Sequence, residues 1–117
     1  MFELNLTEWV GRGELQNKIG EAKDPIVVLM AAKWCGYCSR FLQQLGSFNP
    51  AINTRLVLTD VDEPDESLWD LYRIRLVPTL IVFHQGVEIF RRDGKPGVGL
   101  RIADLEETLD AMRSGSR

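Results

Sequence analysis

The chain has 117 residues, of which 44% are hydrophobic and 26% are charged. These fractions are typical of globular proteins and argue against a disordered, collagen-like or membrane-spanning chain. Fourteen Lys and Arg against seventeen Asp and Glu give a net charge of -3, which argues against nucleic-acid or anionic-lipid binding. A chain of this length buries one core, so we expect a single domain over residues 1–117 with a flexible tail at 114–117.

The N-terminal sequence and the cysteine content indicate the compartment. The first residues are acidic and lack the apolar core and cleavage site of a signal peptide, and no segment approaches the ~20 apolar residues of a transmembrane helix. We therefore expect a cytoplasmic protein without membrane association. The two cysteines, Cys35 and Cys38, are too few for a disulfide scaffold. Such a close pair indicates redox chemistry or metal binding.

The first half of the chain alternates between helix and strand patterns. Arg12–Gly13 is expected to be a turn, followed by a weak helix around residues 14–22. The clearest strand is Pro25–Ala32, a continuous apolar run rich in β-branched residues, as expected of a strand buried on both faces. The next helix has an apolar face that runs from Cys38 to Leu45, and Gly46 is its expected end.

The second half adds two helices, a strand and a hairpin. A strand is expected at 55–61 and a helix from Pro64 to Tyr72. Strand 79–84 is joined through Gln85–Gly86 to an alternating second arm at 87–91, which predicts a hairpin. A turn at 94–99 precedes a last helix whose apolar stripe is Leu105, Leu109 and Met112.

This order of elements predicts an α/β fold. Strands that alternate with helices are typically parallel and joined by right-handed crossovers, and the closing hairpin adds an antiparallel strand at one edge. We therefore expect a central mixed β-sheet, with parallel strands and a closing antiparallel hairpin, flanked by helices on both faces.

The pentapeptide Trp34–Cys38 carries the expected chemistry. It follows the most apolar strand and opens a helix, and ligands of such sheets bind at the carboxyl ends of strands. Cys35 lies at the helix start, where unpaired N–H groups and the helix dipole favour an anion. Cys38 lies on the apolar face and should be shielded. We therefore expect an accessible, ionisable Cys35 and a sheltered Cys38.

An unequal thiol pair suits disulfide exchange. A thiol of pKa ~8.5 is only about 3% ionised near pH 7, whereas a pKa of ~7 makes it half ionised. Cys35 would attack a substrate disulfide, and Cys38 would then displace the substrate and close a Cys35–Cys38 disulfide. Gly36 would allow the tight loop, and Trp34 and Tyr37 would offer aromatic surface to the substrate.

The cysteines and the other polar residues also allow a different chemistry. A zinc site would need two further ligands, and the only other soft donor is His84, which we expect to be an ordinary, partly exposed residue. Two buried structural thiols are a further alternative. An acidic cluster is expected to consist of loop and helix-start carboxylates. Its members are Asp60, Asp62, Glu63, Asp65 and Glu66.

Two segments resemble signatures of the thioredoxin family. Residues 32–38, Ala-Lys-Trp-Cys-Gly-Tyr-Cys, are similar to its active-site segment, and Val77–Pro78–Thr79 is similar to its second signature. The resemblance covers about residues 24–112 and implies the thioredoxin fold. It also implies that Pro78 follows a cis peptide bond, that Val77 offers backbone hydrogen bonds to an extended substrate, and that Gly94 lines the substrate groove.

The chain departs from the family pattern at four positions. Leu29 stands where the resemblance implies a buried aspartate that relays the proton of the second cysteine, and Leu58 stands at its partner lysine. The missing negative charge should lower the thiol pKa values and make the disulfide easier to reduce. Tyr37 replaces the usual proline of the motif, and Gln43 stands near the kinking proline of the helix.

The resemblance implies a protein-disulfide reductase with Cys35 as nucleophile and Cys38 as resolving thiol. Its partners would be disulfide-containing proteins and a separate reductase that donates electrons, and it would need no metal, flavin or nucleotide. We expect a monomer. A protein disulfide oxidase or isomerase, and a non-catalytic thioredoxin-like binding module, remain alternatives, because sequence does not fix the reduction potential.

Overall fold

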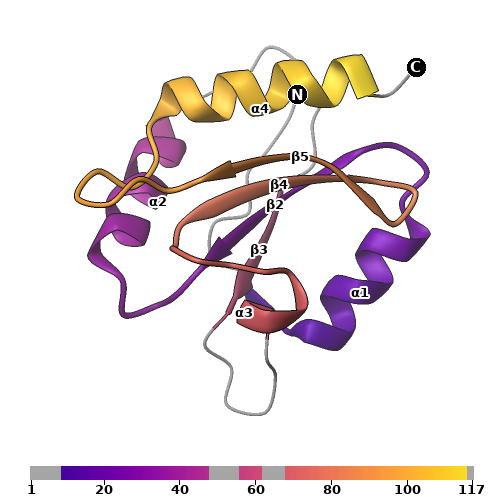
Figure 1. Ribbon diagram of the computed structural model, residues 1–117, viewed down its shortest axis with the longest axis horizontal. Helices are drawn as coiled ribbons and strands as arrows, with labels where there is room; N and C mark the ends of the chain where they lie inside the picture. The colour runs from indigo at the N-terminus through magenta and orange to yellow at the C-terminus, as the bar shows by residue number, and fades with distance from the viewer. Residues whose placement is uncertain (1–8, 48–55, 62–67, 116–117) are drawn as a thin grey trace.

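The computed structural model describes residues 9–47, 56–61 and 68–115, arranged around one central sheet (Figure 1). The elements follow one another as β1, α1, β2, α2, β3, α3, β4, β5 and α4. Their bounds are Trp9–Val10, Arg12–Glu21, Ile26–Ala31, Gly36–Ser47, Leu56–Asp60, Leu68–Leu71, Thr79–His84, Val87–Asp93 and Ile102–Gly115.

The described strands form one mixed sheet in the order β1-β3-β2-β4-β5. β2 and β1 both run parallel to β3, whereas β4 is antiparallel to β2 and β5 is antiparallel to β4. In Figure 1, α4 lies on one side of the sheet, along β4 and β5, and α1 and α3 lie on the other. The α/β class, the mixed sheet and the closing hairpin are confirmed.

The change of strand direction comes earlier than the sequence pattern indicated. We expected only the edge strand of the hairpin to be antiparallel, but β4, inside the sheet, already runs against β2. β4 starts at Thr79, opposite Met30, at the end of the sheet where β3 also finishes. Because β4 starts at the end of the sheet where β3 finishes, it runs in the opposite direction.

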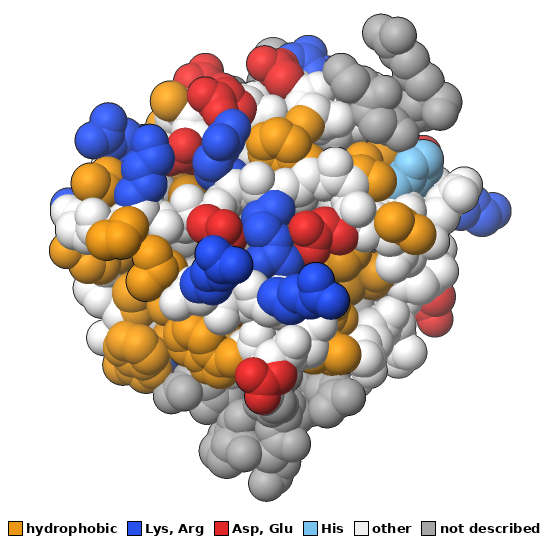
Figure 2. Space-filling view, in the orientation of Figure 1, with side chains coloured by type: hydrophobic (Ala, Val, Ile, Leu, Met, Phe, Trp, Pro, Cys, Tyr) orange, Lys and Arg blue, Asp and Glu red, His pale blue; other side chains and the backbone are white. Residues whose placement is uncertain are grey.

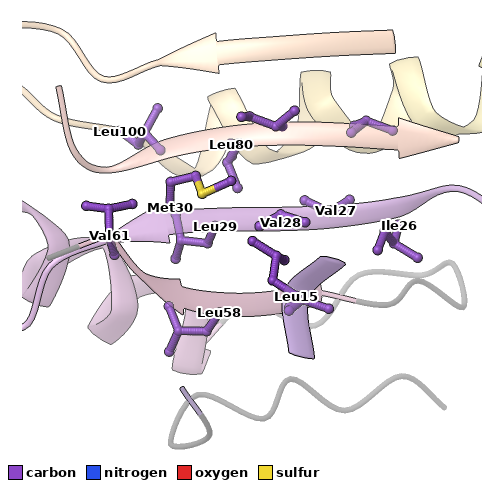
Figure 3. Close-up of a cluster of buried hydrophobic side chains, with 14 of the residues drawn as sticks. Leu15, Ile26, Val27, Val28, Leu29, Met30, Leu58, Val61, Leu80 and Leu100 are labelled. Atoms are coloured by element: carbon purple, nitrogen blue, oxygen red, sulfur yellow. The ribbon is translucent and has the colours of Figure 1, made fainter. Parts of the chain in front are cut away.

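The core is centred on β2, whose six residues are all buried. Figure 3 shows side chains of β2 between Leu58 of β3 and Leu80 of β4, with Leu15 of α1 nearby. Full burial of one such aliphatic side chain contributes about 1.5–3 kcal/mol to stability. A middle strand covered by helices on both faces buries both sets of side chains, which explains its unbroken apolar sequence.

Some boundaries differ from those expected. α1 begins at Arg12, so Arg12–Gly13 is helical and not a turn, because Leu15 and Ile19, four residues apart, are buried and hold the helix. α4 extends to Gly115, within a turn of buried Met112, so the first half of the predicted tail is helical. The start of the helix expected from Pro64 lies outside the described residues.

The short strand β1 was not expected from the sequence. β1 has two residues, too few to show an alternating pattern, and it is placed by its pairing with Leu58 and Thr59 of β3. None of the helices in the described ranges is both long enough and apolar enough to cross a bilayer.

Candidate active site

Cys35 immediately precedes α2 and acts as its N-cap. Its carbonyl oxygen accepts a hydrogen bond from the Ser39 N–H at 3.1 Å, and its Sγ accepts the backbone N–H of Cys38 at 3.3 Å. This is how an N-cap side chain satisfies a free N–H group in the first turn of a helix. Both the N–H donor and the helix dipole favour negative charge on the sulfur. The expected position of Cys35 at the helix start is confirmed.

Cys38 is the third residue of α2 and points into the core. Its side chain is 1% exposed, and Phe41 and Leu45 of the same helix are fully buried. Burial, together with a hydrogen bond to the Cys35 side chain, raises the pKa of the Cys38 thiol from 9.0 to about 12. Cys38 is therefore a protonated thiol at neutral pH.

Cys35 is more enclosed than the sequence indicated, whereas Cys38 is sheltered as expected. Cys35 is only 6% exposed, so the expectation of a solvent-accessible thiol is wrong. The Val77 carbonyl oxygen lies 3.7 Å from Cys35 Sγ and accepts a hydrogen bond from the thiol, although the two residues are 42 positions apart. Both thiols are therefore buried, and they differ in their hydrogen-bond partners.

Val77, Pro78 and Gly94 come together beside Cys35. The Val77–Pro78 peptide bond is cis, as the resemblance implies. Gly94 directly follows β5 and is buried against Pro78, because a Cβ built on Gly94 would lie 2.6 Å from the Pro78 carbonyl oxygen. These residues, distant in sequence, form one wall of the site. Their contribution to substrate binding stays a prediction.

An apolar rim surrounds the two thiols. Trp34 is 65% exposed, Tyr37 is 41% exposed, and Leu76, next to Val77, is 38% exposed. Exposed apolar side chains grouped around a reactive group suit contact with a polypeptide segment. Leu76 was missed from the sequence, because a single leucine in an irregular segment belongs to no pattern.

Tyr37 is held in place by an arginine and by a glycine turn, two contacts that were missed from the sequence. The Arg40 guanidinium lies 5.3 Å from the centroid of the Tyr37 ring and donates a hydrogen bond to the Val98 carbonyl. A Cβ on Gly99 would lie 3.0 Å from Tyr37 Cβ, and the φ of Gly99 is +78°, so only glycine fits comfortably. The spacing Tyr37–Arg40 on a predicted helix was a signal for the first contact.

Gly36 has no steric role between the cysteines. It is the first residue of α2, and a Cβ built on it would meet no neighbouring atom within 4 Å. The loop therefore gives no steric reason for glycine here, because the helical turn itself sets the spacing of Cys35 and Cys38. A contact between Gly36 and the substrate stays a prediction.

A carboxylate on β3, that of Asp60, affects the pKa of Cys38. Leu29 and Leu58 pair across β2 and β3 and are buried, whereas Asp60 pairs with Ala31 at the end of these strands and is 8% exposed. The negative charge of Asp60 contributes to the raised pKa of Cys38. Asp60 is thus a buried strand residue and not a loop carboxylate. The other four residues of the acidic cluster lie outside the described ranges.

Leucine at position 29, in place of the family's buried aspartate, was expected to lower the thiol pKa values. At Cys38 burial in apolar surroundings has the larger effect, and it raises the pKa.

The zinc alternative is not supported by the arrangement of the donors. His84 is the last residue of β4, at the opposite end of that strand from Pro78, so it cannot join Cys35 and Cys38 in one site. Across residues 9–47, 56–61 and 68–115, no group of three or more His, Cys, Asp or Glu side chains is placed to hold a metal ion.

Replacement of Gly94 by alanine is expected to lower the free energy of unfolding by about 1–3 kcal/mol, because the added methyl group would overlap the Pro78 backbone. Urea denaturation measures the change. Gly13→Ala is the matched control: it lies in α1 with open space around it, and there alanine is expected to stabilise by about 0.5–1 kcal/mol. Equal stability of wild type and Gly94→Ala would contradict this packing.

Comparison with known proteins agrees with this arrangement. The chain is 24% identical over 94 residues to Thioredoxin Y, chloroplastic, of Oryza sativa subsp. japonica, an alignment that covers 80% of this chain and 56% of that protein. It thus spans little more than half of the rice protein. It is 28% identical over 89 residues to Thioredoxin Asp f 28 of Aspergillus fumigatus, covering 75% of this chain and 78% of that protein.

Solved structures with a similar fold include other thioredoxins. Reduced thioredoxin pre-protein of Schistosoma mansoni superposes with a TM-score of 0.71 at 25% identity, covering 87% of this chain and 92% of the other. The Thioredoxin family model matches residues 7–109, from before β1 into α4. Because this match includes both the cysteine pair and the Val77–Pro78 segment that meets it, the chain belongs to the thioredoxin family.

Proposed function

We propose that the protein is a thiol–disulfide oxidoreductase that reduces disulfide bonds of other proteins through Cys35 and Cys38. The observation that carries this proposal is the unequal environment of the two sulfurs. Cys35 Sγ accepts an N–H group at a helix N-terminus, while Cys38 stays a buried, protonated thiol hydrogen-bonded to it. In this proposal Cys35 is the attacking nucleophile, and Cys38 is the resolving thiol that reacts second.

The reaction follows from these environments. The Cys35 thiolate attacks one sulfur of the substrate disulfide, the substrate S–S bond breaks, and the released thiolate takes up a proton. Cys38 then gives up its proton and attacks Cys35 Sγ, which forms the Cys35–Cys38 disulfide and releases the second substrate thiol. Two electrons pass from the cysteine pair to the substrate.

The surroundings of Cys35 suit an extended substrate segment. The Val77 carbonyl, now hydrogen-bonded to the Cys35 thiol, is available to a substrate N–H once that proton has left. Trp34, Tyr37 and Leu76 supply apolar contacts around it, and the absence of a side chain at Gly94 lets this glycine pack closely against Pro78.

The exchange itself needs no metal, flavin or nucleotide, since both the electrons and the nucleophile come from the thiols. In the proposed cycle a separate reductase returns the oxidised pair to the dithiol. We expect the protein to act as a monomer in the cytoplasm on disulfide-containing proteins.

The test is dithiol-dependent reduction of insulin, combined with the reduction potential of the Cys35–Cys38 pair. A reductase is expected to catalyse the reaction and to have a potential near about -270 mV, whereas about -180 mV would indicate an isomerase. The Cys35→Ser, Cys38→Ser double variant is the control and should be inactive. If wild type and double variant reduce insulin equally slowly, the proposal is wrong and a binding role is favoured.

A further inference from the structure

An open groove of about 980 Å³ lies between α2 and the start of α4. Its lining residues come from the outer side of α2, the turn that follows β5, and the first residues of α4. They are Arg40, Gln43, Gln44, Gly97, Val98, Leu100, Arg101 and Ile102. The lining thus combines apolar side chains with guanidinium and amide groups.

The charged groups that line the groove are both cationic. Arg40 and Arg101 are exposed, and neither forms an ion pair with another described residue. Of the nearby α4 carboxylates, Asp104 accepts the backbone N–H of Arg101 at 2.8 Å and lies 3.8 Å from Arg92 Nε, and Glu107 pairs with the same arginine of β5. Figure 2 shows Lys and Arg side chains over this end of the molecule, with acidic ones along α4. The charged side chains that line the groove are therefore both positive, in a chain of net charge -3.

The groove is linked to the site of the two thiols through Arg40. Arg40 is two residues beyond Cys38 on α2, and its guanidinium both contacts the Tyr37 ring and donates to the Val98 carbonyl in the groove wall. The hydrogen bond and the ring contact hold this cation in one place, so binding an anion there costs less side-chain entropy than at a free surface arginine. A polypeptide lying across Tyr37 would therefore pass close to the Arg40 guanidinium.

We propose that this groove binds an acidic segment of the substrate protein, next to the disulfide that it presents to Cys35. The inference rests on the proposed function and adds a substrate class to it. Carboxylates would meet Arg40 and Arg101, Gln43 and Gln44 would donate to backbone or side-chain oxygens, and apolar side chains would contact Val98 and Ile102. Such mixed contacts favour a peptide over an isolated anion.

Binding can be measured without turnover, on the Cys35→Ser, Cys38→Ser variant. Fluorescence anisotropy with a peptide that carries an uncharged dye would compare an acidic sequence with the same sequence in which Asp and Glu are replaced by Asn and Gln. We expect the acidic peptide to bind at least about tenfold more tightly at low ionic strength, and the difference to shrink at high salt. Equal binding of the two peptides would overturn the proposal.

Two substitutions locate the binding site. Arg101→Glu should weaken binding of the acidic peptide about tenfold, and Gln44→Glu by a smaller factor, because each places a carboxylate in the groove. Arg113→Glu, at the far end of α4, and Gln16→Glu, on α1, make the same changes in net charge away from the groove and should leave affinity unchanged. If the groove variants and their controls behave alike, the groove is not the binding site.

The same variants in the wild-type cysteine background separate this proposal from the proposed function. Arg101→Glu should lower kcat/KM about tenfold for a disulfide in an acidic peptide and leave it unchanged for a small uncharged disulfide. Activity that ignores peptide charge would overturn the groove alone. Groove-dependent peptide binding without any disulfide reduction would overturn the proposed function alone.

Discussion

Replacing Cys35 by serine is expected to lower disulfide reduction on the order of a thousandfold or more, the scale found when a covalent nucleophile is removed. A serine hydroxyl at the N-cap would still accept the Cys38 N–H, so α2 should keep its start and the variant should fold. The remaining thiol, Cys38, cannot take over the attack because it is buried and protonated at neutral pH.

Cys38→Ser is the matched variant, and it should give a different result. Cys35 can still attack, but no second thiol is present to release the substrate, so a mixed disulfide should accumulate in stoichiometric amount. Mass spectrometry of each variant after incubation with a disulfide peptide measures both outcomes. A stable adduct on Cys38 in the Cys35→Ser variant would reverse the assigned roles.

The stability of the reduced protein is expected to fall as the pH rises from about 9 toward about 12, the ordinary and the folded-state pKa of Cys38. Below this range Cys38 is protonated in both the folded and the unfolded state, and its contribution to stability is fully present. Within the range the unfolded chain releases the proton while the folded chain retains it. The free energy of unfolding then decreases by up to about 1.4 kcal/mol per pH unit.

The oxidised protein is the control for this pH dependence, because its Cys38 sulfur has no proton to lose. Urea denaturation of both forms at increasing pH gives the difference in slope, from which titration of lysine and tyrosine side chains largely cancels. A second control, Cys38→Ala in the reduced form, should lose the steeper slope as well. Parallel curves for reduced and oxidised protein would show that Cys38 titrates as in an unfolded chain.

Much of the fold could be predicted from local patterns. The apolar run around Ile26–Ala31 identified the middle strand, and the Gln85–Gly86 turn identified the hairpin. The direction of β4 could not be predicted, since it depends on which end of the sheet the chain has reached after α3. A strand as short as β1 exists only through its pairing with β3.

The sequence by itself determined the two reactive sulfurs and their order along a helix start, because an N-cap and a residue one turn later are set by local spacing alone. The tertiary structure decided what surrounds them. The carbonyl of Val77 over Cys35, the contact of Gly94 with Pro78 and the proximity of Asp60 to Cys38 all join segments far apart in the chain. Exposure and ionisation depend on such neighbours, and neighbours are fixed only when the strands pair and the helices pack.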